Sequence, residues 1–159
     1  MSTDLPPLGT YTPADIPWAT IEARLRAAFH YWLSTTRPDG RPHAVPIWGV
    51  WEQGAFYFYT EPQTQKARNL AAHPAAVVHL ESADDVIIVE GPTSVVPEAD
   101  EQWRQVEAAL FDKYKDPDSG AGLRLSAAPR PPVVYRLQPR HVRAWAHGNS
   151  FAQAHWHFG

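Results

Sequence analysis

Cysteine is absent from this chain of 159 residues, and its absence removes several kinds of site at once. Disulfides, thiolate metal centres and a cysteine nucleophile are all excluded, and the composition fits a reducing cytoplasm. An excess of positive charge is also missing, since the net charge is −3 and the isoelectric point is near 6.2. We therefore expect no nucleic-acid partner.

Long hydrophobic runs are missing as well. The opening segment MSTDLPPLGTYTP has neither a basic start nor an apolar stretch, and no later segment approaches the length of a membrane span. The sequence therefore predicts a cytoplasmic protein with no membrane association.

Aromatic residues and histidine are plentiful, with 7 Trp, 6 Tyr, 6 Phe and 8 His. Large rings supply much apolar contact area per residue, either in a core or at an interface. The length and the hydrophobic share of 44% fit one soluble globular domain. A chain of this size can bury a core, but a deep ligand cleft would need a partner subunit.

The first half of the chain predicts one helix followed by a meander of strands. Residues 18–29 show helical spacing of apolar side chains, and Asp39-Gly40 is a strong signal for a tight turn between two strands. The second strand, residues 43–52, contains Pro46 and Gly49, which suggest a bulge or a close approach to the backbone. A turn at Gln53-Gly54 then completes a three-stranded meander over residues 30–60.

The second half predicts further strands and two helices. A short helix over residues 64–72 ends before Pro74, and Asp100 precedes a longer amphipathic helix. The remaining expected segments are strands at 75–81, 86–96, 133–139 and 141–148, a loop at 115–132 and a tail at 149–159. Strands joined by hairpin turns favour a mainly β fold, an antiparallel barrel with helices outside it. In this single domain, residues 1–17 form an extended arm, 18–29 a helix, 30–148 the barrel with its helices, and 149–159 the tail.

The segment from Tyr57 to Leu70, YFYTEPQTQKARNL, leads from a strand directly into a basic helix. Unpaired amides at the helix start, together with Lys66 and Arg68, form a possible anion site, most simply for a phosphate. The competing interpretation is a solvated helix face, which is the common role of Lys and Arg on short helices.

Three segments in order carry a family likeness: WLSTTRPDGRPHAVPIWGVW, YFYTEPQTQKARNLAAHPAAVVHLE and DDVIIVEGP. Together they resemble the pyridoxamine 5′-phosphate oxidase-like split β-barrel family, and more narrowly its flavin/deazaflavin oxidoreductase branch. The resemblance implies an FMN-binding-like split barrel of six or seven strands. It also implies a homodimer with a flavin-type cofactor between the subunits.

The resemblance also assigns candidate cofactor-binding residues. The cofactor phosphate would lie on Gln65, Lys66 and Asn69, with Arg68 close by. The ring would lie along Pro46, Ile47 and Trp48, and Thr60 would lie at the lip between these two groups.

Two arginines and two tryptophans each have two possible roles. Arg37 and Arg41 flank the Asp39-Gly40 turn, where they either keep the hairpin soluble or bind an acidic tail such as the oligoglutamate of the deazaflavin coenzyme F420. Trp48 and Trp51 lie three apart, so on a regular strand they face opposite sides. At least one of them is expected in a core or interface, and the other could stack beside the ring.

Two further observations concern metal and acid chemistry. His155 and His157 would share one face of a strand, but no third ligand is evident in the sequence, so a structural role is favoured and no metal is expected. Glu90 lies in the apolar run VIIVEG and is either a buried carboxylate or an outward-facing residue of an alternating strand. No catalytic triad, carboxylate pair or glycine-rich phosphate loop is present, and no catalytic residue is assigned.

The function implied by the resemblance is hydride transfer between coenzyme F420, or FMN, and a small planar acceptor. Vitamin B6 oxidation is less favoured, because residues 44–52 contain no Lys or Arg to read FMN. Deazaflavin relatives often end in a Thr-Arg-Trp-x-Phe run, whereas this chain has Ala154-His155-Trp156-His157-Phe158. F420 is favoured slightly over FMN because the resemblance to the deazaflavin branch is closer and the ring-binding strand is uncharged. A non-catalytic module that binds or stores a flavin, deazaflavin or haem is the alternative.

Overall fold

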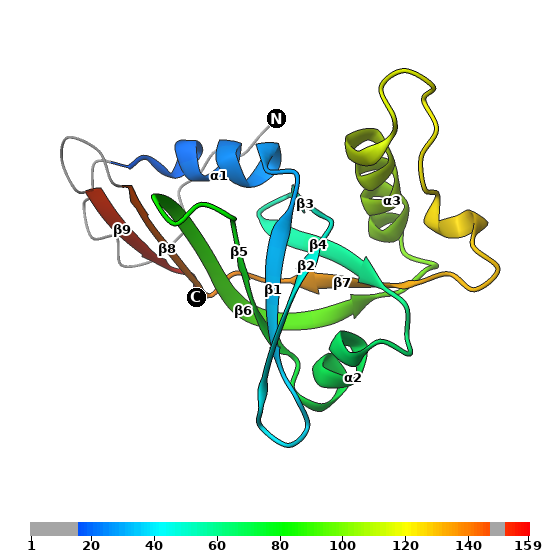
Figure 1. Cartoon of the computed structure of the whole chain (residues 1–159), viewed down its shortest axis with the longest axis horizontal. Helices are drawn as coiled ribbons and strands as arrows, with labels where there is room; N and C mark the ends of the chain where they lie inside the picture. The colour runs from blue at the N-terminus through cyan, green and yellow to red at the C-terminus, as the bar shows by residue number, and fades with distance from the viewer. Residues whose placement is uncertain (1–15, 147–151) are drawn as a thin grey trace.

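The computed structural model describes residues 16–146 and 152–159 of the chain (Figure 1). The fold is mainly β, with a curled antiparallel sheet and three α-helices around it. In chain order the elements are α1 (Trp18–Ala27), β1 (Tyr31–Thr36), β2 (Pro42–Ile47), β3 (Gly49–Glu52), β4 (Ala55–Thr60), α2 (Gln65–Ala72), β5 (Ala75–His79), β6 (Asp85–Val96), α3 (Glu101–Tyr114), the 3-10 turn η1 (Leu125–Ala127), β7 (Val133–Leu137), β8 (His141–Ala146) and β9 (Ala152–His157).

The sheet follows the order β2-β1-β5-β6-β7-β4-β3, and β8 and β9 extend it from the first half of β6. The long strand β6 joins the two parts of this split barrel, because residues up to Glu90 pair with β8 while Thr93–Val96 pair with β7. The change of partner occurs at Gly91-Pro92, where the sequence suggests a kink. A Cβ atom on Gly91 would lie 1.9 Å from the carbonyl oxygen of Gln138, so only glycine fits there.

The expected three-stranded meander over residues 30–60 is wrong in one respect. The predicted strand 43–52 is divided at Trp48 into β2, which pairs with β1, and β3, which pairs with β4. The chain therefore crosses from one part of the barrel to the other at this point. A close approach accompanies the crossing, since a Cβ on Gly49 would lie 2.2 Å from the ring of Phe56.

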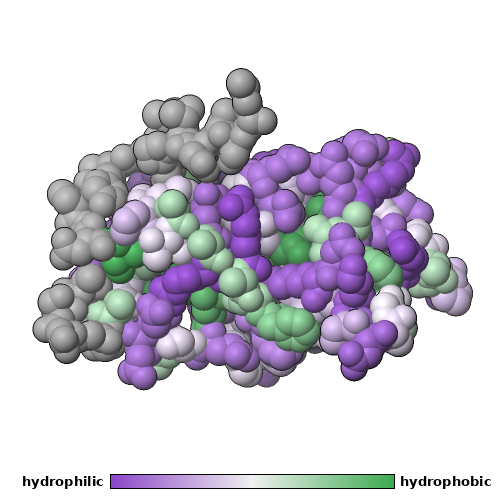
Figure 2. All heavy atoms as spheres, turned by 90° about the horizontal axis from the view of Figure 1, so that it is seen from above, coloured by the Kyte–Doolittle hydropathy of each residue, from purple (hydrophilic) through white to green (hydrophobic). Residues whose placement is uncertain are grey.

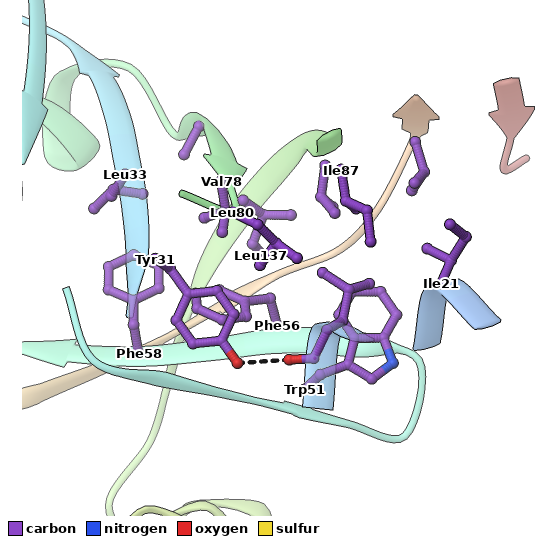
Figure 3. Packing of buried hydrophobic residues seen from close by; sticks show 14 of the residues in the cluster. Ile21, Tyr31, Leu33, Trp51, Phe56, Phe58, Val78, Leu80, Ile87 and Leu137 are labelled. Atoms are coloured by element: carbon purple, nitrogen blue, oxygen red, sulfur yellow. Dashed lines mark hydrogen bonds between the residues drawn. The ribbon is translucent and has the colours of Figure 1, made fainter. Parts of the chain in front are cut away.

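The main core lies between α1 and the barrel interior, and Figure 3 shows the side chains of several strands converging there. Tyr31 is fully buried in this core, and its hydroxyl donates a hydrogen bond of 2.5 Å to the carbonyl of Leu25 at the end of α1 (Figure 3). Trp51 is also buried and donates its indole N–H to Glu22 on α1 at 3.0 Å. Burial of these polar groups is compensated by the hydrogen bonds, and both bonds attach α1 to the barrel.

The helices are amphipathic and cover different parts of the barrel. Trp103, Val106 and Leu110 of α3 pack in a second apolar cluster with residues of β3, β4 and β7. Seen from above, the surface is mainly hydrophilic, with hydrophobic residues reaching it in limited areas (Figure 2). Within the described ranges, no helix is long and apolar enough to span a membrane.

The C-terminal region differs from the expected tail. Part of it, Ala152–His157, forms strand β9, which pairs antiparallel with β8 and places His157 opposite His141. The sequence predicts a tail over 149–159, within which the spacing of His155 and His157 allows a short strand. The proposed N-terminal arm, residues 1–17, lies almost entirely outside the described residues.

Candidate functional site

A groove of about 510 Å³ lies where the end of β2, the end of β4 and the start of α2 meet. Its volume is in the range of small-molecule sites. One wall is apolar and the other is polar, with a cation at the start of α2. The lining residues are His30, Pro46, Ile47, Trp48, Tyr59, Thr60, Glu61, Thr64 and Lys66.

The start of α2 is built to present amides to this groove. Thr64 is the N-cap residue, and its hydroxyl accepts a hydrogen bond from the amide of Ala67 at 3.4 Å. The hydroxyl of Thr60 at the end of β4 bonds that of Thr64 at 2.9 Å, which connects the strand end to the cap. The amides of Gln65 and Lys66, in the first turn, have no acceptor within the helix and carry the positive end of the helix dipole.

Lys66 is the cation of the groove. Its ammonium group is half-buried and forms no hydrogen bond or ion pair with any residue in the described parts of the chain, and burial lowers its pKa. Burial lowers the pKa of His43, and the positive charges of Arg37 and Lys66 lower it further. These three basic groups therefore lie near one another. Glu61 lines the same groove and limits its net positive charge. A ligand anion would therefore supply a partner that Lys66 lacks.

Trp48 forms the aromatic part of the apolar wall. It is 40% exposed and stacks on Tyr114 of α3, with ring centroids 4.6 Å apart and planes 7° from parallel. Tyr114 is held in turn by its hydroxyl, which accepts from the amide of Gly49 at 3.0 Å and donates to the carbonyl of Phe29 at 2.8 Å. Trp51 points the other way and is 1% exposed, as the expected separation of the two tryptophans requires.

The predicted site residues divide into two groups. Pro46, Ile47, Trp48, Thr60 and Lys66 are brought together in the groove. The other five, Gln65, Arg68, Asn69, Arg37 and Arg41, do not line it.

Three of these residues form hydrogen bonds within α2, to its entry turn or to β1: Gln65, Arg68 and Asn69. Asn69 is fully buried; it donates to the hydroxyl of Thr35 at 2.9 Å and accepts from Gln65 at 2.7 Å. Arg68 donates to the carbonyl of Gln63 at 2.6 Å and to the side chain of Gln65 at 3.0 Å. These three residues therefore hold α2 and its entry turn in place.

Arg37 and Arg41 lie on the β1–β2 hairpin. The guanidinium of Arg41 is exposed and pairs with Asp39 at 2.9 Å, an arrangement that fits the role of keeping the hairpin soluble. That pairing lowers the pKa of Asp39. Arg37 lies closer to the cationic region around His43 and Lys66.

Four groove residues were not identified from the sequence: His30, Tyr59, Glu61 and Thr64. Thr64 had a usable signal, because a threonine directly before a helix is a preferred N-cap. His30 had none, since it precedes β1 and reaches the groove only through the curvature of the barrel.

Glu90, which the sequence leaves as either buried or outward-facing, faces outward and forms an ion pair with Arg143 of β8 at 2.7 Å. It is not a buried acid. His155 and His157 do share one face of β9, and the structure adds a third histidine, His141, beside them.

The fold agrees with comparisons to known proteins. The model of the family described as pyridoxamine 5′-phosphate oxidase matches residues 17–146. The chain belongs to the pyridoxamine 5′-phosphate oxidase family. The resemblance read from the three sequence segments is thereby confirmed.

Relatives in the pyridoxamine 5′-phosphate oxidase family include a curated pyridoxine/pyridoxamine 5′-phosphate oxidase of Azorhizobium caulinodans, 28% identical over 170 residues, covering 86% of this chain and 80% of the relative. Two further curated relatives of the same description are matched over about half of their own length.

Solved structures share the split barrel. A conserved hypothetical protein of Mycobacterium tuberculosis has a TM-score of 0.69 at 25% identity, covering 84% of this chain and 87% of the other. An F420 reductase has a TM-score of 0.60 at 25% identity, covering 76% and 94%. A haem storage protein of Vibrio cholerae has a TM-score of 0.62 at 21% identity, covering 77% of this chain and 89% of the other. At this identity the likeness shows only that the two proteins share a fold.

Proposed function

We propose that the protein is an oxidoreductase that binds the deazaflavin coenzyme F420, or FMN, and transfers a hydride between it and a small planar acceptor. The observation that carries the proposal is the ammonium of Lys66. It is half-buried, has no acidic partner among the described residues, and lies in one groove with the apolar wall formed by Pro46, Ile47 and Trp48.

The groove residues fit both parts of a flavin-type cofactor. A phosphate at the start of α2 would accept hydrogen bonds from the ammonium of Lys66 and from the first-turn amides. The hydroxyls of Thr60 and Thr64 lie beside this position. A planar ring fits against the apolar wall, where Trp48 is held flat by its stacking on Tyr114.

When bound, the flavin or deazaflavin ring supplies the hydride chemistry, and the chain supplies position and exclusion of water. No side chain needs to act as an essential base, so no catalytic residue is assigned. Gln65, Arg68 and Asn69 would act indirectly, because their mutual hydrogen bonds orient the first turn of α2.

F420 is slightly favoured over FMN. The stretch 44–52, which contains the ring wall, has no Lys or Arg, and the F420 reductase is among the structural relatives at 25% identity. Arg37 would assist by binding the acidic tail of F420, since it lies on the cationic side of the groove near Lys66. Arg41 would contribute less, because Asp39 already pairs with it.

The experiment is a titration of the purified protein with F420 and with FMN, followed by fluorescence, and then an assay of hydride transfer from the chemically reduced cofactor to a quinone-type acceptor. We expect Lys66→Ala to weaken binding of the preferred cofactor about 10- to 100-fold, because one charge-assisted contact to a phosphate is lost. The matched control is Lys115→Ala, since Lys115 is an exposed lysine paired with Asp112 and not part of the groove.

Each other outcome has a definite meaning. Tight binding without turnover by any acceptor would favour a binding or storage module for a flavin, deazaflavin or haem. Formation of pyridoxal 5′-phosphate from pyridoxamine 5′-phosphate with bound FMN would favour vitamin B6 oxidation, as in the curated relatives. If neither cofactor binds, or if Lys66→Ala binds as well as the unmodified protein, the proposed site is wrong.

A further inference from the structure

Three histidines come together on the outer face of the β6–β8–β9 part of the sheet. Along β8 and β9 side chains alternate between the two faces: Val142 and Trp156 are buried toward the core, whereas His141 and His157 lie opposite each other on the outer face. His155 is two residues from His157 and therefore shares that face. None of the three lines the groove at α2, so this cluster is separate from the proposed cofactor site.

The geometry of the cluster is close to that of a metal centre. One ring nitrogen of each histidine lies within 4.8 Å of one ring nitrogen of each of the others. The ring centroids of His155 and His157 are 4.1 Å apart, and those of His141 and His157 are 4.6 Å apart.

Unused ring nitrogens point to a missing ligand. Nδ1 of His141 and Nε2 of His155 are buried and have no hydrogen-bond partner among the residues that the structure describes. Buried polar atoms without a partner are uncommon in folded proteins and raise the free energy of the folded state. A metal ion is a partner that accepts lone pairs from several ring nitrogens at once.

We propose that His141, His155 and His157 bind one divalent transition-metal ion, of which Zn²⁺ is the best fit. Imidazole nitrogens favour Zn²⁺, Co²⁺, Ni²⁺ and Cu²⁺ over the oxygen-seeking ions Mg²⁺ and Ca²⁺. A tetrahedral Zn²⁺ holds its nitrogen ligands at about 2.0–2.1 Å, which sets them about 3.4 Å apart. Rotation of the three side chains closes the remaining gap, because the strands already place them at adjacent positions.

An acid and a second groove lie beside the histidine cluster. His141 and Glu90 lie opposite each other on β8 and β6, and both line a groove of about 550 Å³ on this face of the sheet. Glu90 already neutralises Arg143, which lies opposite His155. A water molecule in the fourth position, within reach of the Glu90 carboxylate, would complete the coordination without removing that ion pair.

Metal binding would stabilise the edge strand β9 against β8. In the described part of the sheet β9 pairs only with β8, so its other edge has no partner strand. Two of the ligands are on β9 and the third is on β8, and an ion shared by them cross-links the two strands. The site would therefore stabilise the C-terminal end of the barrel.

The test uses the full-length chain without a polyhistidine tag, stripped with a chelator and then titrated with Co²⁺ and with Zn²⁺. We expect one equivalent of Co²⁺ to produce visible d–d absorption and to be displaced by Zn²⁺. His155→Ala and His157→Gln should each weaken binding about tenfold or more, since even losses outside the first coordination shell reach this size. His73→Ala is the matched control, because His73 is an exposed histidine at the end of α2.

A second measurement keeps the proposal testable if a variant folds poorly. In the unmodified protein, Zn²⁺ should raise the melting temperature and slow hydrogen exchange of the β8 and β9 amides, while Mg²⁺ should do neither. The proposal is overturned if no metal binds, or if substitution of His155 and His157 leaves both affinity and stoichiometry unchanged. A stoichiometric site that responds only to His73 would overturn it equally.

Discussion

Lys113 lies in an unusual place for a lysine, beneath the crossing of β2 and β3. Its ammonium donates to the hydroxyl of Tyr31 at 2.6 Å and to the carbonyl of Gly49 at 3.0 Å. Burial lowers the pKa of Lys113 to about 8, and Glu52 opposes that effect. The same burial raises the pKa of Tyr114, which bonds the same glycine, to about 12. These groups connect α3 to the turn that carries Trp48.

The pKa of Lys113 predicts a pH dependence of stability. Between pH 8 and the ordinary lysine pKa of 10.5, the unfolded chain keeps a proton that the folded chain has released, so the free energy of unfolding rises with pH. Above about pH 10 the buried tyrosines reverse the trend, because unfolding then releases their protons. Compared with Lys113→Met, the unmodified protein should gain on the order of 1 kcal/mol from pH 8 to 10, after allowance for solvent screening.

Urea unfolding at several pH values measures this difference, with Lys115→Met as the control because Lys115 is exposed. A parallel pH profile for the unmodified protein and Lys113→Met would show that Lys113 titrates normally.

At the scale of elements, one buried polar side chain connects α2 to the sheet by hydrogen bonds. Asn69 joins α2 to β1 through Thr35 and also bonds Gln65 in the first turn. Asn69→Ala leaves the hydroxyl of Thr35 without this donor in a buried place, and should lower the free energy of unfolding by about 1–3 kcal/mol. Cofactor affinity should fall as well, because the first turn loses its orientation. Gln63→Ala, an exposed change on the entry turn, should alter stability by no more than about 0.5 kcal/mol.

The middle of β6 lies very close to the backbone of the β7–β8 turn, at Gly91. Gly91→Ala would place a methyl group against the carbonyl of Gln138, and this backbone atom cannot rotate away as a side chain could. We expect a loss of about 3 kcal/mol or more, seen as a lower urea midpoint with an unchanged slope. Gly159→Ala is the control, since a Cβ there meets nothing within 4 Å. Equal midpoints for the two variants would mean that β6 and the β7–β8 turn can separate without cost.

At the scale of the whole molecule, large aromatic side chains are exposed at the groove and beside it. Trp48, Phe29 and Trp32 are large apolar side chains with 40%, 50% and 37% of their surface exposed. Exposed aromatic residues of this size are typical of interfaces. A second copy of the chain is the occupant that the family resemblance implies, and it would close the groove over a bound ring.

Sedimentation over a range of concentrations tests this prediction. We expect the mass of two chains, and we expect cofactor affinity to fall once dilution separates them. A single-chain mass at every concentration, with cofactor affinity intact, would show that the groove needs no partner.

Much of the fold was predictable because it depends on short-range patterns. The apolar spacing of α1 and α3, the Asp39-Gly40 turn and the stop of α2 before Pro74 act over a few residues, and each was found within a few positions of its place. The division of 43–52 was not found. The interruption at Trp48 depends on long-range pairing, because the β1–β2 hairpin joins the sheet through β5 whereas the β3–β4 hairpin joins it through β7.

The candidate site shows the same division. Lys66 at the start of a helix is a local feature that the sequence by itself determined, and the family resemblance added Pro46, Ile47 and Trp48. Three other groupings were decided only by tertiary structure: Asn69 with Thr35, Lys113 with Tyr31, and His141 with His155 and His157. Asn69 and Thr35 are 34 residues apart and Lys113 and Tyr31 are 82 apart, while His141 lies on a different strand from His155 and His157, so only the tertiary fold brings these groups together.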